Sequence, residues 1–461
     1  MRMYDIIEKK RDGEKLSKLE IEFFINEYSK SNIPDYQAAA LIMAIYLNGI
    51  DEEELKDLTL AMAHSSKMID LSDIKRHGKY IIDKHSTGGV GDKITLIILP
   101  IIASLNIDTF KMSGRGLGFT GGTADKIESI VGYNVNLSVE EAKSQVEDIG
   151  VCLISQSKDI AIADKKLYAL RDTTATVEKV ELIASSIMSK KIACGAEKLV
   201  LEVTVGNGAF AKTEEEGIKL ANMMVSLGKL TGIETVAIIT KMDEPIGKMV
   251  GNSLEIKEVV EFLNQSEIEY NSNMNLDLKE IVLAISSWMI KLSDKTIDFE
   301  SCKEMVKEVI LSGKAYNKFL ELIKAQGGDT KLITLENGKK VECPILREDA
   351  HFLKEIKAEK EGFITDINSK KIGEALVLLG GGRENKSDEI NYSVGFEFSK
   401  KVGDKVSVGD TILKVYYDDK DRFNNAFELI SDSIIIQDID AKIGMSLKNR
   451  PHIINVIGDN V

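Results

Sequence analysis

The sequence predicts a multidomain α/β protein, in which a mostly parallel sheet is combined with an all-helical domain and a strand-rich C-terminal domain. Residues 3–66 show only the helical periodicity of apolar residues. From Tyr80 to about residue 325, short apolar runs alternate with helical segments, which is typical of an open parallel sheet. After about residue 330 the pattern changes to short strands and turns. The length of 461 residues agrees with about three domains.

The N-terminal region carries clear helix start and stop signals. Ser17 and Glu20 form an S-x-x-E capping box ahead of the apolar segment IEFFINEY. Asp35 is predicted to cap the helix QAAALIMAIYL, which ends at Asn48-Gly49. Asp51 starts a further helix, so this region reads as a small helical domain.

The middle of the chain is predicted to build the sheet. Helices over 139–150 and 215–232 separate predicted strands, and ITLIILPIIASL (94–105) is also predicted as a helix because it follows directly on a glycine loop. The predicted strands are YIIDK (80–84), DTFKMS (108–113), VCLISQ (151–156), LVLEVTVG (199–206) and TVAIIT (235–240).

Residues 157–193 interrupt this alternation, because they are mostly helical. We expect them to pack on the N-terminal helices, which makes the first domain discontinuous. The predicted division is an all-α domain (1–70 and 157–193), an α/β domain (71–156 and 194–330) and an α+β, β-rich, hammerhead-like C-terminal domain (331–461).

Composition excludes several classes of protein. Lys and Arg number 60 against 74 Asp and Glu, and a net charge of −14 argues against nucleic acid or an anionic membrane as partner. The four cysteines form no C-x-x-C pair, and the five histidines form no H-E-x-x-H pair. The longest apolar stretch, Ile94 to Leu105, is too short to span a bilayer, and MRMYDIIEKKRDGEK lacks an apolar signal core. We expect a cytoplasmic protein.

The first candidate ligand loop is DKHSTGGVGD (83–92), which lies between a predicted strand and a helix. Glycines allow the backbone to approach a ligand closely, and the N–H groups of such a loop suit a phosphate. Ser86 and Thr95 add hydroxyl donors, and Lys84 adds a positive charge. The pattern GxxxxGK[ST] does not occur in the chain, so the loop is not a Walker A loop.

The second glycine loop, KMSGRGLGFTGGTADKIE (111–128), also follows a predicted strand, where ligands sit in open α/β sheets. It contains a formal GxGxxG, but the segment about 20 residues further on is helical, which disfavours a dinucleotide site. Ser113 and Thr123 are better interpreted as further phosphate donors. Arg115 and Asp125 are predicted to form a structural ion pair that holds the loop, in preference to direct ligand contact.

A third group of polar residues lies in the helical insertion. Ser186 and Lys190 are spaced i, i+4 on one helix and therefore share a face. Arg171 precedes a Thr-Thr-Ala-Thr turn. Two cations and a hydroxyl directed to one point suit a planar group that gains negative charge, and solvated helix charges are the alternative.

These three motifs together resemble the thymidine phosphorylase and pyrimidine-nucleoside phosphorylase family along nearly the whole chain. The matching segments are KHSTGGVGD, SGRGLGFTGGTADKIE and YALRDTTATV…SSIMSKK. The resemblance implies an all-α domain that faces an α/β domain across a cleft, with phosphate on the α/β side and the base mostly on the α side. It also implies closure of the two sides during catalysis and a homodimer.

The resemblance implies roles for particular residues. His85 lies beside the base and is a candidate general acid or hydrogen-bond donor, and Lys111 joins the cations of the cleft. The implied phosphate contacts are Lys84, Ser86, Thr95, Lys111, Ser113 and Thr123, the base contacts are Arg171, Ser186 and Lys190, and the apolar walls are Leu117, Val177, Ile183 and Phe210. His85, Arg171 and Lys190 are the implied catalytic residues.

Members of the family that bind potassium imply a site near Gly91, Ile246, Met249 and Glu258. Lys93 stands where such members carry a small hydroxyl residue, so its ammonium is the alternative occupant. Phe119 stands where a histidine is common in the family.

The implied reaction is the reversible phosphorolysis of pyrimidine nucleosides (uridine, thymidine and deoxyuridine) to free base and α-D-(deoxy)ribose 1-phosphate, for pyrimidine salvage. Phosphate is a co-substrate, and no organic cofactor is expected. Lys111 favours broad specificity over a strict thymidine phosphorylase, in which an apolar residue is usual. The remaining alternatives are a related-fold phosphoribosyltransferase, such as an anthranilate phosphoribosyltransferase, and a carrier role for the C-terminal domain. Gly380-Gly-Gly-Arg383 is predicted to be a plain turn, and a loop over the active-site cleft is the alternative.

Overall fold

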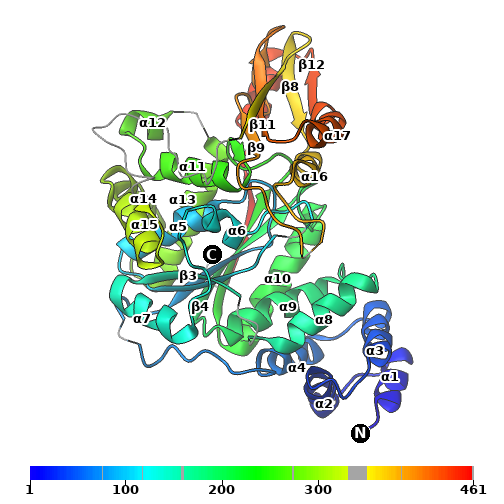
Figure 1. Ribbon diagram of the computed structural model, residues 1–461. Helices are drawn as coiled ribbons and strands as arrows, with labels where there is room; N and C mark the ends of the chain where they lie inside the picture. Colours follow the sequence, from blue (N-terminus) through cyan, green and yellow to red (C-terminus); the bar gives the residue numbers. More distant parts are fainter. Residues whose placement is uncertain are drawn as a thin grey trace.

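The computed structural model describes residues 1–74, 76–116, 118–156, 160–272, 275–330, 350–385 and 387–458. It confirms the predicted fold class, with N-terminal helices, a central α/β sheet and a strand-containing C-terminal part (Figure 1). Leu117, together with the predicted start of the C-terminal domain at 331–349, lies outside these ranges.

Four helices form the N-terminal part. The predicted capping box of Ser17 and Glu20 is present. A second capping box, formed by Asp51 and Glu54, explains why a helix starts after Asp51 as predicted. The predicted cap at Asp35 is wrong, because this residue is the first of its helix and its carboxylate accepts a hydrogen bond of 3.1 Å from the Tyr28 hydroxyl. The helices are α1 (Met3–Arg11), α2 (Lys18–Ser29), α3 (Asp35–Asn48) and α4 (Glu52–Ala63).

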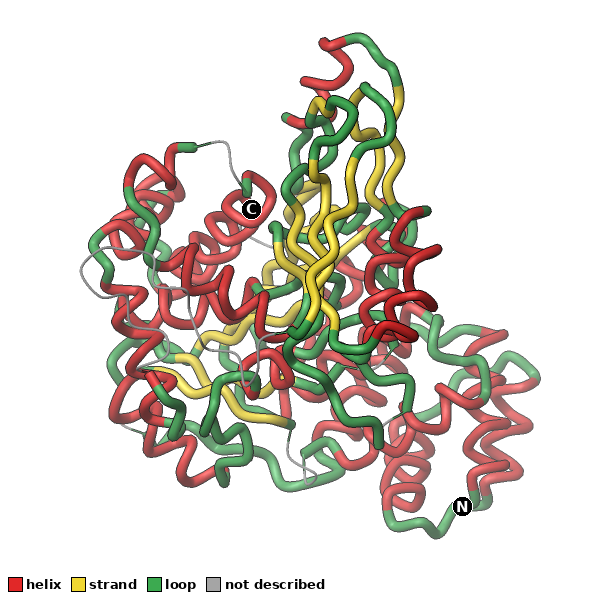
Figure 2. Tube along the Cα trace, turned by 45° about the horizontal axis from the view of Figure 1, so that its top comes forward, coloured by secondary structure: helices red, strands yellow, loops and turns green. Residues whose placement is uncertain are grey.

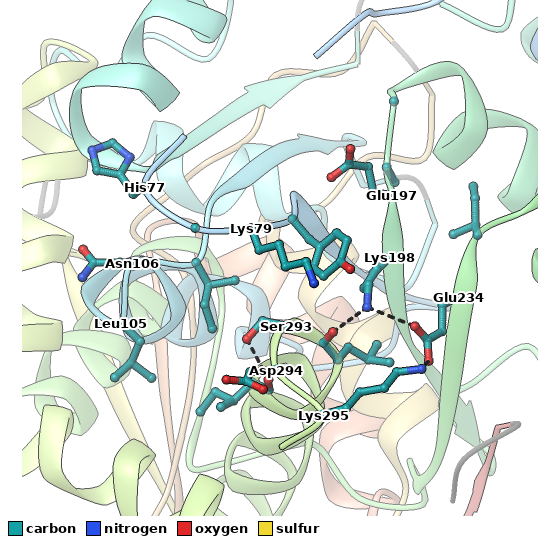
Figure 3. Close-up of a pocket in the computed structure, with 18 of the residues that line it drawn as sticks. His77, Lys79, Leu105, Asn106, Glu197, Lys198, Glu234, Ser293, Asp294 and Lys295 are labelled. Carbon is teal, nitrogen blue, oxygen red and sulfur yellow. Dashed lines mark hydrogen bonds and ion pairs between the residues drawn. The ribbon is translucent and has the colours of Figure 1, made fainter. Parts of the chain in front are cut away.

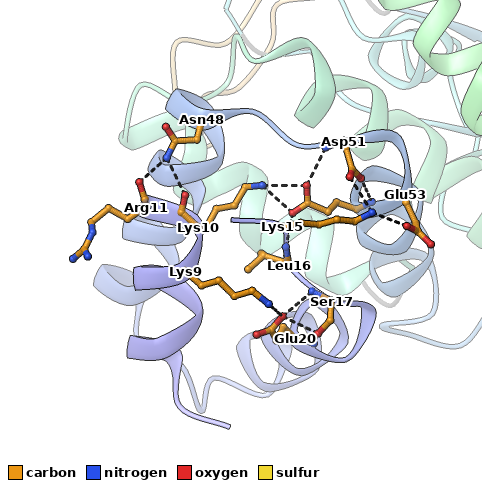
Figure 4. Close-up of polar contacts among 11 residues, drawn as sticks. Lys9, Lys10, Arg11, Lys15, Leu16, Ser17, Glu20, Asn48, Asp51 and Glu53 are labelled. Carbon is orange, nitrogen blue, oxygen red and sulfur yellow. Dashed lines mark hydrogen bonds and ion pairs between the residues drawn. The ribbon is translucent and has the colours of Figure 1, made fainter. Parts of the chain in front are cut away.

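A buried glutamate ties these helices together (Figure 4). The Nζ atom of Lys10 donates to Oε1 and Oε2 of Glu54 at 2.8 and 3.1 Å, and both side chains are buried. The backbone N–H of Leu16 also donates to Glu54 Oε1, at 2.8 Å. Since the charge of Glu54 is satisfied from α1 and from the segment before α2, this residue fixes the position of α4 against both.

The helices α8 (Ile162–Thr173) and α9 (Val180–Ala193) lie against the N-terminal helices, where α9 packs on α4 and α8 on α2 (Figure 1). Leu167 and Leu182 belong to the same apolar core as α1 to α4. Lys166 Nζ donates to the backbone oxygen of Tyr28 at 2.7 Å. Residues far apart in the sequence therefore share one core here.

The central sheet has the order β1-β4-β5-β13, in which β1 (Ile82–Ser86), β4 (Lys198–Val205) and β5 (Glu234–Lys241) are parallel. The last strand, β13 (Ile453–Ile457), pairs antiparallel with β5. A parallel bridge between Ile81 and Asp108 places the parallel pair β2 (Thr109–Ser113) and β3 (Val151–Ser155) beside β1.

Helices cover both faces of this sheet, which explains the continuous apolar strands. Along β4, Val200 belongs to the core shared with α5, α13 and α15, whereas Leu199 and Leu201 belong to the core shared with α9 and α10. The covering helices are α5 (Ile94–Ser104), α11 (Asn252–Leu263), α13 (Leu276–Ser293), α14 (Phe299–Leu311) and α15 (Lys314–Ala325) on one face, and α7 (Val139–Ile149), α9 and α10 (Glu214–Thr231) on the other. The short helices α6 (Thr123–Glu128) and α12 (Glu267–Asn271) complete this part.

The C-terminal part contains two small antiparallel sheets, β6-β9-β11-β7 and β10-β8-β12, whose strands stand beside one another in Figure 2. Strand β6 (Met249–Val250) comes from the central part of the chain. The other elements are β7 (Phe352–Lys357), β8 (Gly362–Ile367), α16 (Ser369–Leu379), β9 (Gly395–Phe398), β10 (Lys405–Val406), β11 (Thr411–Tyr417), α17 (Lys420–Ser431), β12 (Ile434–Gln437) and α18 (Ala441–Lys448). Among the described helices, none has the length and apolarity needed to cross a membrane.

Candidate active site

The first glycine loop leaves the carboxyl end of β1 and enters α5. Gly88 and Gly91 have φ values of 92° and 74°, a left-handed conformation that favours glycine. A Cβ atom on Gly91 would lie 2.6 Å from the backbone oxygen of Ile246, so a side chain cannot be accommodated there. Gly88 donates its backbone N–H to the Ser86 hydroxyl at 3.1 Å. The loop is therefore held in one tight conformation at the strand end.

The second glycine loop leaves the carboxyl end of β2 and is held by Asp125. Arg115 Nη1 lies 3.1 Å from Asp125 Oδ1, which confirms the predicted structural ion pair. The backbone N–H of Gly116 donates to Asp125 Oδ2 at 2.7 Å. Arg115 also pairs with Glu128, through Nη2 at 2.7 Å. The buried Asp125 carboxylate, at the end of the loop, thus binds Arg115 and Gly116 near its start.

Gly380-Gly-Gly-Arg383 contacts the same loop, and its prediction as a plain turn is wrong. Arg383 Nη1 donates to Asp125 Oδ2 at 2.9 Å, and the backbone oxygen of Arg383 accepts from Gly118 N at 2.9 Å. This segment follows α16, so the C-terminal part of the chain contributes directly to the geometry of the glycine loop.

The two loops and α9 enclose a cavity of about 240 Å³. It brings together seven of the predicted site residues, namely His85, Ser86, Thr95, Lys111, Ser113, Thr123 and Lys190, and Arg115 of the structural ion pair also lines it. It is also lined by Ile187, Lys190 and Lys191 of α9 and by Cys194, which directly follows this helix, and the four residues recur at the spacing of one helix face.

Lys84 lies behind this cavity and does not line it. Its side chain is fully buried, its Nζ atom pairs with Glu202 Oε2 at 2.7 Å, and it lies 3.4 Å from the Thr95 hydroxyl. Burial raises the pKa of Glu202, although Lys84 opposes this effect. Lys84 therefore supports Thr95 from the protein side and places a positive charge close to the wall of the cavity.

A second buried carboxylate, Asp83, organises two further lysines. Lys191 Nζ lies 2.7 Å from Asp83 Oδ2, and Lys111 Nζ lies 3.4 Å from Asp83 Oδ1. Lys111 also donates to the backbone oxygen of Lys84. Burial lowers the pKa of Lys111 to about 7, and the neighbouring ammonium groups of Lys191 and Lys84 add to this effect while Asp83 opposes it.

His85 is surrounded by positive charge. Burial, followed by the ammonium groups of Lys191 and Lys111, holds the pKa of His85 well below its usual range. The imidazole is therefore neutral near neutral pH and can donate one ring N–H. This state supports the predicted role of hydrogen-bond donor better than that of general acid.

On the α9 side, Lys190 lines the cavity but Arg171 does not. Lys190 Nζ lies 2.9 Å from Asp164 Oδ2 and 3.3 Å from the Ser186 hydroxyl. The buried Arg171 donates to the backbone oxygens of Thr176, Val177 and Leu182 at 3.2, 2.7 and 3.1 Å. Its guanidinium thus holds the turn between α8 and α9.

The other sequence-predicted residues lie outside the cavity lining. Ser186 is buried beneath Lys190, and Ile183 packs on the core under α9 one turn before Ile187. Val177 contributes its carbonyl to Arg171, and the side chain of Phe210 is half exposed. Phe119 packs against the core of the C-terminal part.

The residues implied for potassium are brought together, but a lysine lies among them. Lys93 Nζ donates to the backbone oxygen of Ile246 at 2.6 Å and pairs with Glu258 Oε2 at 2.9 Å. Met249 donates its backbone N–H to the same carboxylate at 2.9 Å. Because a buried ammonium already binds these oxygens, the residues do not fit a second cation here. The described residues also contain no cluster of three or more His, Cys, Asp or Glu side chains that could hold a metal ion.

A larger cavity, of about 1220 Å³, lies at the other end of the sheet (Figure 3). It is lined at the amino ends of the strands, where Lys198 begins β4 and Glu234 begins β5. These two side chains pair at 3.0 Å, and Lys295 pairs with Glu234 at 2.7 Å. None of the sequence-predicted site residues that the structure describes lines it, and its side chains Lys198, Glu234 and Lys295 form ion pairs among themselves.

Sequence reasoning missed Lys191, which lines the smaller cavity, and two carboxylates that pair with its lysines or with Lys84 behind it, Glu202 and Asp164. Glu202 is the only charged residue inside the apolar run LVLEVTVG, which is a usable signal. Lys191 follows a lysine already singled out, and its direction into the cavity is visible only once α9 is placed. Asp164 had no signal, because its partner Lys190 is distant in sequence.

Family comparisons agree with this architecture. The chain matches the glycosyl transferase family, helical bundle domain over residues 4–66 and a/b domain over 78–316, and the pyrimidine nucleoside phosphorylase C-terminal domain over 363–437. Fold and site thus define a glycosyltransferase, an enzyme of the pentosyltransferase class. A crystal structure of anthranilate phosphoribosyltransferase from Thermus thermophilus shows the same fold, with a TM-score of 0.55 and 16% identity over 70% of this chain and 99% of that one.

Comparison with individual proteins assigns the chain to one family within this class of enzymes. The pyrimidine-nucleoside phosphorylase of Staphylococcus haemolyticus is 45% identical over 95% of this chain and 96% of its own length. Those of Staphylococcus epidermidis and Staphylococcus aureus are 45% and 44% identical over 91% and 95% of this chain, and over 93% and 97% of their own lengths. The chain belongs to the pyrimidine-nucleoside phosphorylase family.

Proposed function

We propose that the chain catalyses the reversible phosphorolysis of pyrimidine nucleosides, including uridine, thymidine and deoxyuridine, to free base and α-D-(deoxy)ribose 1-phosphate, for pyrimidine salvage. The observation that carries the proposal is the cavity in which hydroxyl groups from two strand-end loops meet lysines from α9. The names of the relatives support the same reaction.

The phosphate subsite lies at the two glycine loops. The hydroxyl groups of Ser86, Thr95 and Ser113 line the cavity and can donate to phosphate oxygens. Thr123, which begins α6, lines it as well. Lys84 stands behind Thr95, and its charge stabilises an anion that binds in front of it.

The base subsite lies against α9. Cleavage of the C1′–N1 bond leaves negative charge on the pyrimidine, and the ammonium of Lys190 stabilises this charge more strongly as it grows. Arg171 has five N–H donors and uses three on backbone oxygens, which leaves two for the base when the two sides of the site close. Ser186 orients Lys190 through their contact of 3.3 Å.

The reaction needs no protein nucleophile. Bound phosphate attacks C1′ from the face opposite the base, which gives the α-configured sugar phosphate. His85 donates a hydrogen bond from its neutral ring to the leaving base, since a cationic imidazolium is disfavoured beside Lys111 and Lys191. Closure of the α side on the α/β side brings the reactants together and excludes water that would hydrolyse the sugar.

Broad specificity rests on Lys111. Its aliphatic chain and ammonium lie in the cavity wall between the two glycine loops, where a ribose 2′-hydroxyl can accept a hydrogen bond from Nζ. A strict thymidine phosphorylase is the second candidate. The likeness to a phosphoribosyltransferase concerns the fold alone, and the same assay with phosphoribosyl pyrophosphate in place of phosphate would reveal that activity.

The assay compares uridine and thymidine, each with and without phosphate. We expect phosphate-dependent release of uracil and of thymine, measured by chromatography, and an α-sugar 1-phosphate signal in ³¹P NMR. Absence of base release with phosphate would refute the proposal, and release of thymine alone would favour the strict enzyme.

A matched pair of serine variants locates the phosphate. Ser113→Ala is expected to raise KM for phosphate by roughly tenfold, because one donor to a charged oxygen is lost. Ser155 is the strand partner of Ser113 in β3 but does not line the cavity, so Ser155→Ala should leave KM unchanged. Equal effects of both changes would contradict the assigned subsite.

The family resemblance further supports a cytoplasmic homodimer that needs no organic cofactor. It also supports the division of the chain into an all-α domain (1–70 and 157–193), an α/β domain (71–156 and 194–330) and a C-terminal domain (331–461). Strands β6 and β13 each pair across these limits, so we propose that the C-terminal domain moves together with the α/β domain when the site closes.

A further inference from the structure

Lys93 is a fully buried lysine whose ammonium binds two parts of the chain at once. Its Nζ atom lies 2.6 Å from the backbone oxygen of Ile246 and 2.9 Å from Glu258 Oε2. Lys93 precedes the first residue of α5, whereas Glu258 lies in α11. The contact therefore joins the first glycine loop to the segment that runs from β5 to α11.

The carboxylate of Glu258 is saturated on its other sides. It accepts backbone N–H groups from Lys248 at 2.8 Å and Met249 at 2.9 Å, and the side-chain amide of Asn275 at 3.0 Å. Glu258 and Lys93 both lie in the protein interior, where an ionised carboxylate needs a positive partner. Lys93 is that partner.

The position of Lys93 connects this contact to the site. Its backbone N–H donates to the oxygen of Gly91 at 2.9 Å, and Ile246 donates to the oxygen of Val90 at 3.1 Å. Thr95, which lines the cavity, follows Lys93 by two residues. Loss of the Lys93 contact would therefore release the loop that presents Ser86 and Thr95.

We propose that the ammonium of Lys93 permanently fills the place of a monovalent cation, so that this enzyme neither binds potassium there nor requires it. An ammonium group resembles K⁺ in size and charge, and it binds the same kinds of ligand here, a backbone carbonyl and a carboxylate. A tethered cation stays in place at every salt composition, whereas a free ion binds according to its concentration.

The first experiment uses the unmodified enzyme. The midpoint of thermal unfolding, Tm, is measured in potassium chloride and in choline chloride of equal ionic strength. We expect Tm to differ by less than about 1 °C, because no ion is exchanged at this place. A rise in Tm that saturates with potassium, and that choline does not cause, would overturn the proposal.

The second experiment removes the ammonium group of Lys93. Lys93→Ser leaves space and the oxygens of Ile246 and Glu258, so we expect Tm to fall by roughly 5 °C or more in choline and to recover by at least half in potassium or ammonium. Lys93→Met fills the space without charge, and we expect the same fall with no recovery.

Lys10 supplies the matched control. It is a buried lysine paired with a buried glutamate, Glu54, in the N-terminal helices. Lys10→Ser should lower Tm, and potassium should not restore it. If Lys93→Ser is not restored by any monovalent cation, or if Lys10→Ser is restored equally, the assignment is wrong.

A kinetic measurement tests whether the Lys93 contact supports phosphate binding at the site. Unlike the thermal measurements, it rests on the proposed function. KM for phosphate in Lys93→Ser should rise at least tenfold in choline and return toward the unmodified value in potassium, with kcat changed less. If Tm of Lys93→Ser depends on potassium but the unmodified enzyme shows no phosphorolysis, the proposed function is refuted and the cation assignment stands.

Discussion

Arg383 reaches from the segment after α16 to Asp125 at the start of α6, where its Nη1 atom donates to Oδ2 at 2.9 Å. Asp125 also binds Arg115 and the backbone N–H of Gly116. One buried carboxylate therefore links the C-terminal part of the chain to the glycine loop that presents Ser113 and Thr123. The second glycine loop depends on a residue that is distant from it in sequence.

Replacement of Arg383 should weaken phosphate binding. In Arg383→Ala the buried Asp125 loses one of its two guanidinium partners, and the loop gains conformational freedom that phosphate binding must remove. We expect KM for phosphate to rise on the order of tenfold, about 1.4 kcal/mol, with a smaller change in KM for the nucleoside. Initial rates with either substrate varied in turn give both constants.

Arg76 is the matched control for this prediction. It pairs with Glu197 at 2.8 Å, at the opposite end of the sheet. Arg76→Ala also removes an arginine–carboxylate pair but leaves the glycine loop untouched, so both KM values should stay unchanged. Equal increases in the two KM values of Arg383→Ala would mean that the loop is not the element affected.

Lys190 and Arg171 should each contribute to stabilisation of the base anion. We expect Lys190→Ala and Arg171→Ala to lower kcat/KM for uridine by about 2–4 kcal/mol, roughly 30- to 1000-fold. Lys179 directly precedes α9, the helix of Lys190, and its side chain neither caps that helix nor lines the cavity, so Lys179→Ala should be nearly neutral. Unmodified kcat/KM in both of the first two variants would refute the assigned roles.

Asp164 should act through Lys190. The contact of 2.9 Å holds the ammonium in place, and Asp164→Asn keeps a hydrogen-bond acceptor while removing the charge. We expect a smaller loss of kcat/KM than in Lys190→Ala, and we expect the double variant to be no worse than Lys190→Ala alone. Additive losses in a double-mutant cycle would show that the two residues act independently.

The sequence alone predicts those features of the structure that are formed by residues close together in the chain. Glycine loops at strand ends, capping boxes and the pair Arg115/Asp125 all depend on residues within about ten positions of each other, and all are present in the structure. The alternation of strands and helices likewise predicted the sheet, because strands buried on both faces are apolar throughout.

Distant pairings could not be predicted. The ion pairs Lys84–Glu202 and Lys190–Asp164 depend on tertiary packing, which no periodicity in the chain specifies. The segment containing Arg383 looked like a plain turn, since its glycines favour turns and nothing local indicates that its arginine reaches Asp125. Nothing local indicates that Arg171, which is predicted to contact the base, also donates hydrogen bonds to three backbone carbonyls.

Anion binding should weaken as pH rises through about 7. The pKa of Lys111 in the free enzyme is about 7, and a bound anion favours the charged ammonium and so raises this pKa. The contribution of Lys111 to binding is therefore complete below pH 7 and is lost above it. Sulfate, which does not titrate in this range, is the suitable probe. Its inhibition constant should increase by up to tenfold per pH unit above about 7.

Lys111→Met separates this effect from other titrations. The variant should bind sulfate more weakly at pH 6 and should show a flatter dependence between pH 6 and 9. It should also lose more activity toward uridine than toward thymidine, if Nζ contacts the 2′-hydroxyl. An unchanged pH dependence in the variant would assign the titration to another group.

His85 should stay neutral throughout the working pH range. Burial and the ammonium groups of Lys191 and Lys111 disfavour the imidazolium, so ¹H–¹⁵N correlation spectra of labelled histidine should show its neutral form down to pH 6. His85→Asn keeps one N–H donor and should retain more activity than His85→Ala. Protonation of His85 above pH 6 would restore the general-acid role.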